Sequence, residues 1–576
     1  MRFDELARPR DAAIDYQRLV FDYRPSPDQH APAPVRRPVV VVGAGPVGLA
    51  LAVDLAQRGV PVVLLDDDDR LSTGSRAICF AKRTLEILDR LGCGAKVVDK
   101  GVSWNVGRVF FRDKQVWQFD LLPEPGHARP AFVNLQQYYV EGFLAERAAA
   151  LPRVDARWRN SVVGLEPRGD HVALSIDTPD GIYGLEAAYV AACDGSRSAL
   201  RRLLGLESTG RTFRDRFLIA DVRMQHDAPA ERWFWFDPAF HPNQSVLLHR
   251  QPDGVWRIDF QLGWDADPEE EKRPENILRR VRALLAHSEM KDAAIELVWA
   301  SVYTFSCVRM ARFRHGRVLF AGDAAHGVSP FGARGANSGV QDADNLGWKL
   351  AAVVQGHAPD ALLDTYAAER EFAADENIRH STRSTDFITP KSEVSRLFRD
   401  AVLTLAKTQP FARGLVNSGR LSTPSTLQAS TLNTPDAVDD FTGAMVPGAP
   451  AADAPVLLAD GREGWLLQQL GAGFTVLAAV DDAGGLAGID GQGLAVTVLR
   501  AAAPPADAHT HAHPHAHAHT HTQADLRDPT GLLTRRYDLR PGTVYLLRPD
   551  QHVCARWRHA DAAQVDAAIR RALAFA

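Results

Sequence analysis

The order of apolar and polar residues near the N-terminus predicts two strands of a parallel sheet joined by a helix. Residues 39–43 (VVVVG) form a continuous β-branched run, which is typical of a strand buried on both faces. In the next segment Val47, Leu51 and Leu55 fall on one face of a helix. The apolar run VPVVLLD (60–66) predicts the second strand. Together these elements form a βαβ unit of the usual length.

The middle of the chain contains further patterned segments. Residues 80–91 predict an amphipathic helix, and short alternating runs between 154 and 193 predict a small meander that returns to the main sheet. Residues 213–306 alternate strongly in places and include clustered aromatic residues, so we expect a separate, mainly β region. The run RVLFAGDAAH (317–326) predicts another buried strand, and residues 337–356 predict a helix.

The C-terminal part of the chain differs in composition and pattern. Residues 385–450 are rich in Ser, Thr and Pro, which favours a linker. Beyond them, alternating helix and strand patterns predict a compact α/β domain. A histidine-rich tract from His509 to His521 interrupts this domain. We expect the tract to be a loop, with chelation of a transition metal as the alternative, and we assign no metal site.

Size, charge and cysteine usage narrow the class of protein. With 576 residues, the chain is expected to form about two to four domains. A formal net charge of -5 predicts no general attraction to nucleic acid or anionic lipid. The N-terminus lacks the apolar core of a signal peptide, and no stretch reaches the ~18 apolar residues that cross a bilayer. The scattered cysteines fit a reducing compartment, so we predict a cytoplasmic location.

A glycine-rich turn between the first strand and helix predicts a nucleotide site. The turn reads Gly43-Ala44-Gly45-Pro46-Val47-Gly48 and allows a pyrophosphate to approach backbone N–H groups at the helix N-terminus. Asp66 ends the next strand, where a carboxylate accepts hydrogen bonds from a ribose. Strand, turn, helix and acid together favour a dinucleotide over a turn that only packs, but they fit NAD and FAD equally.

A second pair of motifs decides between these cofactors. Gly322-Asp323-Ala324-Ala325-His326 is followed by Pro330-Phe331-Gly332-Ala333-Arg334-Gly335-Ala336-Asn337. With the first motif they resemble the class A (single-component) flavoprotein aromatic hydroxylases, the family of p-hydroxybenzoate hydroxylase and 3-(3-hydroxyphenyl)propionate hydroxylase. The resemblance covers about residues 38–380 and implies FAD as the cofactor.

The resemblance also implies roles for the residues of these motifs. Asp323 would place its carboxylate on the ribityl chain of the flavin. The loop after Pro330, which we include among the catalytic candidates, would lead into a helix that begins near Gly335, Ala336 and Asn337. The first N–H groups of that helix would face the pyrimidine end of the flavin ring. A helix N-terminus stabilises the negative charge that reduced flavin carries there.

Three more residues match the family in the same order along the chain. Asp194, in Cys193-Asp194-Gly195, matches an Asp-Gly motif that serves both the flavin and the nicotinamide. Arg76 matches an arginine near the adenosine half of FAD, and Gln137 matches a glutamine that contacts the flavin. Taken singly, Arg76 and Gln137 are typical of surface or salt-bridge residues. Their order within the set favours the cofactor roles.

Arg334 departs from the pattern of many phenolic hydroxylases. Those proteins have Gly-Gly-Gln-Gly in this loop, whereas this chain has Gly332-Ala333-Arg334-Gly335. Our hypothesis is that Arg334 steers an anionic substrate or stabilises the flavin anion. The alternative is that it only braces the loop.

The resemblance implies a monooxygenase that uses NADPH or NADH, O2 and a small aromatic substrate. The nicotinamide would reduce FAD, O2 would form the flavin C4a-hydroperoxide, and a phenolic ring would take up the distal oxygen. One alternative is epoxidation or N-hydroxylation of a heteroaromatic or polyketide ring. Another is a non-catalytic FAD-binding assembly protein. A flavin halogenase is disfavoured, because Asp237-Pro238 stands where that family requires Ile-Pro. We also consider that the protein forms a homodimer.

Candidates for a proton relay to the ring hydroxyl lie within residues 213–306. We assign His249 and Tyr303 as catalytic candidates, near Arg250, Arg257, Asp259, Gln261 and the aromatic run Trp233-Phe234-Trp235-Phe236. The alternative interpretation is that the aromatic residues fill a core and the charged residues line a solvated face.

These predictions combine into an α/β fold with five segments. An extended leader (1–37) precedes a Rossmann-like FAD-binding domain (38–210 and 307–385), into which a mainly β substrate domain of the p-hydroxybenzoate hydroxylase type (211–306) is inserted. A helical linker (386–445) leads to a C-terminal domain (446–576) that resembles the thioredoxin-like domain of phenol hydroxylase relatives. That domain has only Cys554 and no Cys-x-x-Cys, so we expect a structural or oligomerisation role.

Overall fold

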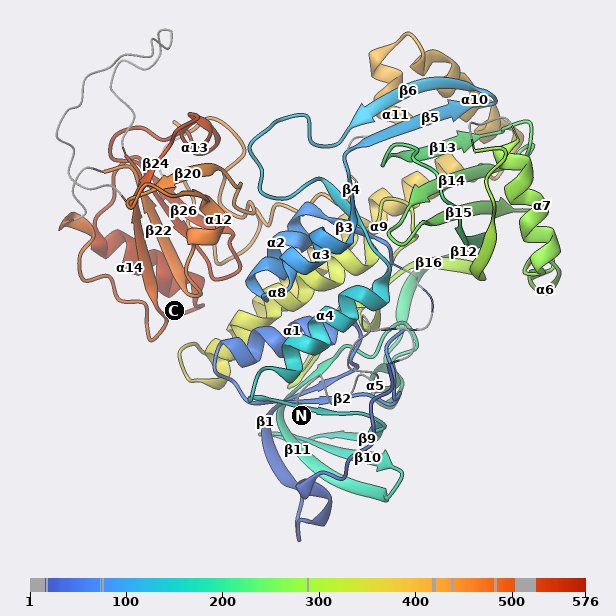
Figure 1. The fold of residues 1–576 in the computed structure, drawn as a ribbon. Helices are drawn as coiled ribbons and strands as arrows, with labels where there is room; N and C mark the ends of the chain where they lie inside the picture. Colours follow the sequence, from blue (N-terminus) through green and yellow to red (C-terminus); the bar gives the residue numbers. More distant parts are fainter. Residues whose placement is uncertain are drawn as a thin grey trace.

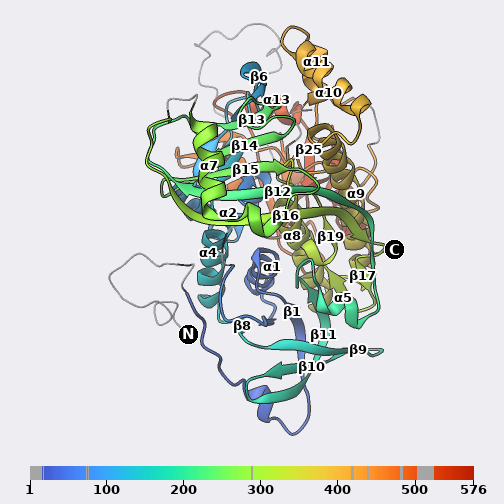
Figure 2. The ribbon, with the colours of Figure 1, turned by 90° about the vertical axis from the view of Figure 1, so that its right-hand side faces the viewer.

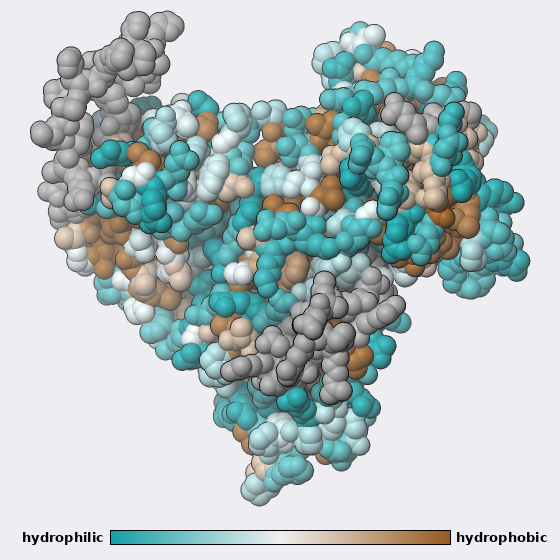
Figure 3. All heavy atoms as spheres, in the orientation of Figure 1, coloured by the Kyte–Doolittle hydropathy of each residue, from teal (hydrophilic) through white to brown (hydrophobic). Residues whose placement is uncertain are grey.

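The computed structural model describes residue 16 and residues 19–72, 74, 77–286, 290–416, 421–436, 440–480, 484–502 and 525–575. Figure 1 shows a central α/β domain, a sheet domain on one side of it and a C-terminal unit on the other. The surface view in Figure 3 shows the same three lobes, with hydrophilic residues predominating on this face. Among the described residues, no helix is long and apolar enough to cross a membrane.

The central domain is built on a mostly parallel sheet with the order β17-β18-β11-β1-β2-β8. Strand β1 pairs in parallel with both β11 and β2, and β9 and β10 extend β11 as an antiparallel meander. The predicted βαβ unit is therefore confirmed as β1-α1-β2. The bounds are β1 Val35–Val42, α1 Pro46–Gln57, β2 Val62–Leu65, α4 Gln137–Ala149, β8 Val154–Arg157, β9 Ser161–Pro167, β10 Val172–Thr178, β11 Gly181–Ala192, α5 Ala199–Leu203, β17 Arg314–His315, β18 Val318–Phe320, η3 Gly322–Ala324, α8 Gly335–Val354 and α9 Leu362–Ile388.

Residues 19–34, the described end of the predicted leader, pack against the central domain. The ring of Phe21 stacks on Trp158 with a centroid distance of 3.8 Å. Asp28, in the short helix η2 (Pro27–His30), accepts a hydrogen bond from Arg157 at 2.6 Å. The ordered fold therefore begins earlier than Pro38, because this segment has its own apolar and ionic contacts.

The second domain is a sheet with the order β19-β16-β12-β15-β14-β13-β5-β6. Strands β5 and β6 come from the range predicted for the FAD-binding domain, but β5 pairs in parallel with β13 and continues this sheet. Apolar side chains of β5 and β6, among them Val109 and Trp117, pack with Phe236 of β13. The bounds are β5 Val106–Phe111, β6 Lys114–Asp120, β12 Ser208–Arg223, β13 Arg232–Phe236, β14 Ser245–Arg250, β15 Val255–Leu262, α6 Pro268–Glu271, α7 Pro274–Leu285, β16 Glu296–Met310 and β19 His326–Gly327.

A small three-stranded sheet, β3-β7-β4, lies where the two domains meet. Strand β3 leads directly into α2, the observed form of the helix predicted for 80–91. After α9, the predicted linker contains two helices, α10 and α11, which Figure 2 shows at the outer end of the sheet domain. The bounds are β3 Cys79–Ala81, α2 Lys82–Arg90, α3 Gly94–Lys100, β4 Val102–Trp104, β7 Phe132–Asn134, α10 Glu393–Ala406 and α11 Pro410–Val416.

The C-terminal unit contains a four-stranded sheet, β23-β22-β25-β26, and a three-stranded sheet, β21-β20-β24. Strands β22 and β23 are parallel, whereas β25 and β26 run antiparallel to their neighbours. The histidine-rich tract lies outside the described residues. The bounds are β20 Pro455–Leu458, β21 Glu463–Trp465, α12 Leu466–Gln469, β22 Phe474–Ala478, η4 Gly484–Leu486, β23 Val496–Arg500, β24 Leu526–Arg527, α13 Leu532–Tyr537, β25 Val544–Leu547, β26 Val553–Trp557 and α14 Ala562–Ala572.

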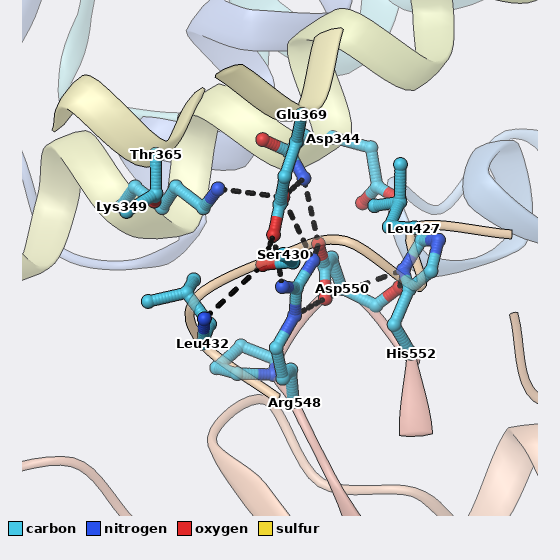
Figure 4. A network of polar contacts seen from close by, with 12 residues as sticks. Asp344, Lys349, Thr365, Glu369, Leu427, Ser430, Leu432, Arg548, Asp550 and His552 are labelled. Carbon is cyan, nitrogen blue, oxygen red and sulfur yellow. Dashed lines mark hydrogen bonds and ion pairs between the residues drawn. The ribbon is translucent and has the colours of Figure 1, made fainter. Parts of the chain in front are cut away.

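A buried ionic network joins the C-terminal unit to helices α8 and α9 of the central domain (Figure 4). Arg548 donates to Glu369 of α9 at 2.6 Å and to Asp550 at 2.7 Å. Lys349 of α8 donates to the same Glu369 at 2.7 Å. All four side chains are almost completely buried. The C-terminal unit is thus fixed to α8, the helix that begins at Gly335.

Candidate active site

The glycine-rich turn between β1 and α1 leaves an open space at the start of the helix. Gly43 has a φ of +102°, and a Cβ built there would lie 2.4 Å from the carbonyl oxygen of Cys193. A Cβ at Gly48 would lie 1.9 Å from the carbonyl oxygen of Gly43. In contrast, a Cβ at Gly45, the N-cap of α1, would meet no atom within 4 Å. This open position in front of a helix N-terminus fits a pyrophosphate group.

Asp66 lies beside the glycine-rich turn, at the end of β2. Its carboxylate accepts hydrogen bonds from the backbone N–H groups of Ala44 and Asp68. Burial raises the pKa of Asp66 to about 6, although these two hydrogen bonds act in the opposite direction. The structure therefore places a carboxylate next to the turn, in the position predicted for contact with a ribose.

Asp194 follows β11 and has an acceptor atom available for a ligand. Its Oδ2 accepts a hydrogen bond from the N–H of Leu200 at 3.0 Å. Its Oδ1 is buried and has no hydrogen-bond partner among the described residues. A buried acceptor without a partner is costly, so this atom indicates a missing donor group such as a hydroxyl.

The second motif packs directly against the first. A Cβ at Gly322, which has a φ of +62°, would lie 2.9 Å from Val47 Cγ2, and a Cβ at Gly339 would lie 2.6 Å from the same atom. The starts of α1 and α8 therefore approach each other closely, and both helix N-termini lie at one site. Asp323, between Gly322 and α8, has an exposed side chain.

The sequence motifs did not single out the carboxylate that anchors this second loop. Asp342 of α8 accepts from the N–H of Gly322 at 3.0 Å and from His326 Nε2 at 2.7 Å. Arg370 of α9 donates to the other oxygen of Asp342 at 2.6 Å. These charges outweigh the effect of burial and hold the pKa of Asp342 below its usual value. Only the position of Asp342 inside a polar stretch of an otherwise apolar helix could have indicated this role.

The loop from Pro330 to Asn337 is held in place from both ends. Pro330 is exposed, and the ring of Phe331 packs edge-on against Phe217 of the sheet domain at 4.9 Å. The amide of Asn337 accepts a hydrogen bond from Ala81 N–H and donates one to the Cys79 carbonyl, both at 2.8 Å. The side chain of Asn337 thus fixes the start of α8 to β3. The N–H groups in the first turn of α8 have no acceptor within the helix and can therefore donate to a ligand.

Arg334 is buried at the N-cap of α8 and contacts helix α9. Its guanidinium donates to Asn377 Oδ1 at 3.0 Å, and Asn377 donates in turn to Ser338 Oγ at 3.2 Å. The bracing role considered for this arginine is therefore part of the structure. Its charge also lies at a helix N-terminus, where the helix dipole disfavours a cation unless an anion is nearby.

Gln137 forms hydrogen bonds with Ser72, Ala77 and Glu141. Its Oε1 accepts a hydrogen bond from Ala77 N–H at 3.1 Å, and its Nε2 donates to Ser72 Oγ at 3.2 Å and to Glu141 at 2.8 Å. Glu141 also accepts from the N–H and the hydroxyl of Ser72. Gln137 therefore joins Ser72 to Ala77. Arg76 itself lies outside the described residues.

The sheet domain has two different faces. One face carries apolar residues such as Leu218, Ile258 and Phe260, which pack against Val281 of α7. The opposite face looks toward the central domain: a Cβ at Gly74 would touch the Trp299 ring, and His249 Nδ1 lies 3.9 Å from Cys79 Sγ. We call this second face the inner face.

Charged residues gather on the inner face, where they are buried. Arg257 forms a bidentate pair with Asp221, with both distances 2.7 Å. His249 lies in register with Arg232 and Arg257 on the neighbouring strands. Arg250, one residue further along β14, belongs to the other face, in register with Trp256. The interpretation that these charges line a solvated face is wrong for His249, Arg257 and Gln261, which are at most 7% exposed.

The two predicted catalytic residues of this sheet both lie on the inner face. Burial and the nearby charges of Arg232 and Arg257 hold the pKa of His249 well below its usual value, so its ring is neutral. Tyr303 of β16 lies in register with Phe217, close to the end of the sheet that contacts Phe331. Together with Phe305 these rings enclose the end of the inner face next to the 330–337 loop.

Comparison with known proteins agrees with this geometry. A family model described as FAD binding domain matches residues 36–381. A 3-(3-hydroxy-phenyl)propionate/3-hydroxycinnamic acid hydroxylase of Mycobacterium sp. (strain JLS) is 30% identical over 522 residues, which cover 89% of this chain and 88% of the relative. The chain belongs to the class A flavoprotein aromatic hydroxylases. It is therefore an FAD-dependent monooxygenase.

This hydroxylase is also similar to a second curated monooxygenase and to a solved flavoprotein structure. The 6-methylpretetramide 4-monooxygenase of Streptomyces rimosus is 37% identical over 341 residues, or 58% of each chain. Among solved structures, the flavin-dependent monooxygenase PieE in complex with FAD and substrate has a TM-score of 0.78 and 21% identity, covering 94% of this chain and 100% of PieE. At that level of identity, the second similarity concerns the fold alone.

The residues of this class A hydroxylase fit FAD. The open space at Gly45 suits the pyrophosphate, and Asp66 lies where a ribose would bind. The buried Oδ1 of Asp194 lacks a donor, and the first turn of α8 presents N–H groups near the same site. Among the described residues, no group of three or more His, Cys, Asp or Glu side chains is arranged to hold a metal ion.

We predict that FAD binds more weakly to the apoprotein below about pH 6. The pKa of Asp66 is raised to about 6, so its carboxylate becomes protonated as the pH falls through that value and loses an acceptor for the ribose. The dissociation constant should rise by up to about tenfold per pH unit below pH 6. Fluorescence titration of apoprotein with FAD between about pH 5 and pH 8 measures this. Asp66→Asn should remove the dependence, and a wild-type constant that does not change with pH would contradict the assignment.

Proposed function

We propose that this hydroxylase adds an oxygen atom to a phenolic ring, using NADPH or NADH and O2. This proposal rests on one observation: the N-terminus of α8 and the inner face of the sheet domain face each other. On one side lies the N-terminus of α8, held by Asn337 and Asp342. On the other side lies the inner face of the sheet domain, with buried polar side chains among aromatic rings. We propose that a flat ring that carries a hydroxyl group binds between them.

The protein contributes position and shielding, and the flavin contributes the redox chemistry. Once reduced by the nicotinamide, bound FAD supplies the oxygen atom derived from O2. The N–H groups at the start of α8 stabilise negative charge on the adjacent ring system. Phe217, Phe305 and Phe331 exclude water from one end of the site. Pro330 and Tyr303 are proposed to contact the substrate, since both lie at that end.

The relatives suggest two kinds of ring substrate for this site. One relative is named for a hydroxyphenylpropionate and another for a methylpretetramide. We favour a phenol as the reacting ring in either case. Epoxidation or N-hydroxylation of a heteroaromatic or polyketide ring is the alternative, because one fold can support different reactions.

A panel of ring compounds tests the proposed reaction. The FAD-loaded protein is mixed with NADPH or NADH and with phenols, hydroxyanthraquinones or heteroaromatic acids, and nicotinamide oxidation and H2O2 release are followed together. We expect at least one phenol to accelerate oxidation without an equal release of H2O2. If every compound gives only H2O2, or if none accelerates oxidation, the proposed hydroxylation of a phenol is wrong.

We predict that Arg334→Gln weakens substrate binding and coupling while the loop stays in place. Glutamine keeps an amide donor for Asn377 but removes the positive charge at the start of α8. Loss of one charge-assisted interaction should raise the KM for the phenol by about tenfold and increase the share of NAD(P)H lost to H2O2. Steady-state kinetics with H2O2 detection measure both quantities. If neither changes, Arg334 is only a brace.

We also propose that the protein forms a homodimer through the outer side of α10 and α11. The inner side of α10, which includes Val402 and Leu403, is buried. Large apolar side chains are exposed on the outer side of the two helices, at Val394, Leu397, Phe398, Leu405, Phe411 and Leu415. A soluble monomer rarely exposes so many neighbouring apolar groups.

The charges of α10 fit a second copy of itself. Antiparallel pairing about an axis near residues 399 and 400 places Val394 opposite Leu405 of the second copy. The same pairing places Glu393 opposite Ala406, next to Lys407, on both sides of the axis. Sedimentation velocity should therefore give a dimer for the wild type and a monomer for Leu397→Glu/Phe398→Glu. Ile182→Glu, at an exposed position near the start of β11, is the control. The proposal is overturned if the wild type is a monomer. It is also overturned if the wild type binds lipid vesicles and the double variant does not.

We also propose a thioredoxin-like fold for the C-terminal unit and a cytoplasmic location for the protein. The order β23-β22-β25-β26, with one parallel pair, supports a thioredoxin-like fold without redox function. The five scattered cysteines, all free thiols, support a cytoplasmic location.

A further inference from the structure

Asp259 lies at the middle of the inner face of the sheet domain. On β15 it is flanked by Arg257 and Gln261, two residues away on either side. Arg257 belongs to the end of the face where His249 meets Cys79, and Gln261 lies in register with Phe217 at the end that contacts Phe331. Cys79 and Phe331 belong to β3 and to the 330–337 loop. Asp259 is therefore placed midway between the two segments that border the proposed flavin ring site.

Arg232 is buried and Asp259 is half-buried, and these two opposite charges have no partners among the described residues. Within the described part of the chain, neither side chain forms a hydrogen bond or an ion pair, and they do not pair with each other. Arg232 is only 8% exposed, and its Nε has no hydrogen-bond partner. The Oδ1 atom of Asp259 is also buried without a partner. The neighbouring Arg257 and Asp221, in contrast, satisfy each other.

Such an arrangement requires a ligand to explain it. A buried guanidinium or carboxylate loses its hydration and is strongly destabilising unless it is paired and hydrogen-bonded. A molecule that lies between the two groups would satisfy both at once. It needs a donor for the carboxylate and an acceptor oxygen for the guanidinium.

Building on the proposed function, we propose that Asp259 accepts the proton of the substrate's ring hydroxyl while Arg232 binds a second oxygen of the same molecule. That second oxygen is an acceptor, either a carboxylate or a ring carbonyl. The substrate class is therefore a phenol with an additional acidic or carbonyl oxygen, and a phenol with only alkyl substituents binds poorly.

The proton balance of the step is closed. As the ring carbon attacks the oxygen atom supplied by the flavin, the hydroxyl proton moves to Asp259 and the ring oxygen becomes a carbonyl. When aromaticity returns, the attacked carbon loses its hydrogen as a proton, and Asp259 returns its own proton to the ring oxygen. The proton from carbon balances the one taken up by the oxygen atom that leaves as water. Asp259 ends as a carboxylate.

The charges around Asp259 suit this role. Burial raises its pKa to about 6, Arg257 on the same strand and Arg232 on β13 lower it, and Asp221 on β12 raises it. His249 on β14 is neutral, and burial keeps Cys79 on β3 a thiol by raising its pKa to about 11. Asp259 is therefore a carboxylate above about pH 6, and activity that depends on it is lost as the pH falls through that value.

Binding measurements test the part assigned to Arg232. The FAD-loaded protein is titrated with 3-(3-hydroxyphenyl)propionate, 1-hydroxyanthraquinone and 3-propylphenol, and the change in flavin absorbance gives each dissociation constant. Arg232→Met should weaken binding of the first or second compound by about 30- to 100-fold and leave 3-propylphenol within about threefold. The compound affected identifies carboxylate or carbonyl as the second oxygen. Equal effects on all three, or none, would overturn the assignment.

Two further variants keep this test decisive. Arg250→Met makes the same substitution one strand away on the other face, where Arg250 donates to Ala228 O at 2.9 Å, and should not change the constants. If Arg232→Met does not fold, as judged by circular dichroism and FAD content, Arg232→Lys retains the charge but loses the fork of donors. It should weaken binding of the same compound by about tenfold.

The pH dependence of the reaction tests the part assigned to Asp259. Wild-type kcat/KM for a stimulating phenol should fall below about pH 6, and Asp259→Asn should lose that limb and about 100-fold of the rate above it. Asp253→Asn, in the exposed turn before β15, is the control. If the wild type is stimulated and Asp259→Asn keeps the same limb, only this assignment is wrong. If no phenol stimulates the wild type, the proposed function is wrong, and the binding measurements still decide the role of Arg232.

Discussion

Gly45→Val is expected to fold normally and to be purified without FAD. Gly45 has an ordinary negative φ, and a Cβ there would meet no protein atom within 4 Å, so the apoprotein has room for the side chain. The added atoms would, however, fill the space in front of α1 that we assign to the pyrophosphate. Loss of two charge-assisted hydrogen bonds to backbone N–H groups corresponds to about 3–6 kcal/mol, or an affinity at least ~100-fold weaker.

The neighbouring glycines make this expectation specific. Gly169→Val, in an open turn between β9 and β10, is the matched control and should retain FAD. Gly43→Ala should instead disturb the fold itself, because its Cβ would overlap the Cys193 carbonyl. Absorbance at the flavin band and thermal unfolding of the purified proteins distinguish these outcomes. A Gly45→Val protein with full FAD content would place the pyrophosphate elsewhere.

Arg548→Met is expected to destabilise the protein by about 3–5 kcal/mol. Arg548 is fully buried and is the shared partner of Glu369 and Asp550. Without it, two buried carboxylates lose their main counter-charge, and Lys349 remains to pair only Glu369. Removing one member of a buried ionic group costs far more than breaking an exposed pair, because the remaining charges cannot be rehydrated.

Chemical denaturation followed by circular dichroism measures this loss of stability. Arg462→Met breaks an exposed pair with Asp460 and should leave the free energy of unfolding unchanged within the error of the measurement. Arg548 and Lys349 also hold the pKa of Glu369 well below its usual value. The stability that Glu369 contributes is therefore lost as the pH falls below about 4.3, the ordinary pKa of a glutamate. If Arg548→Met unfolds like the wild type, the network does not fix the C-terminal unit.

Each motif of the cofactor site could be predicted from sequence because the residues within a motif are close together along the chain. The turn from Gly43 to Gly48 sits between a buried strand and a helix, and backbone geometry alone imposes its spacing. The segment from Gly322 to Asn337 could be recognised for the same reason. The sequence did not reveal, however, that the side-chain amide of Asn337 in this segment forms hydrogen bonds with the backbone of Ala81 and Cys79 rather than with a ligand.

The remaining features depend on contacts between distant segments. Strands β5 and β6 were assigned to the central domain because nothing local indicates that Val106–Phe111 pairs with β13, more than a hundred residues away. The pairing of Glu369 with Arg548 is equally remote in sequence. The alternation of β15 indicated a strand with one polar face. Only the docking of the two domains shows that this face is buried and that Asp259 lies at its centre.

Oxygen incorporation tests the central claim most directly. The FAD-loaded protein is incubated with NAD(P)H, isotopically labelled O2 and a phenol that accelerates nicotinamide oxidation, and the product is analysed by mass spectrometry. We expect one labelled oxygen atom in the ring for each product molecule. Accelerated oxidation that yields only labelled H2O2, or a product whose new oxygen comes from water, would contradict the account.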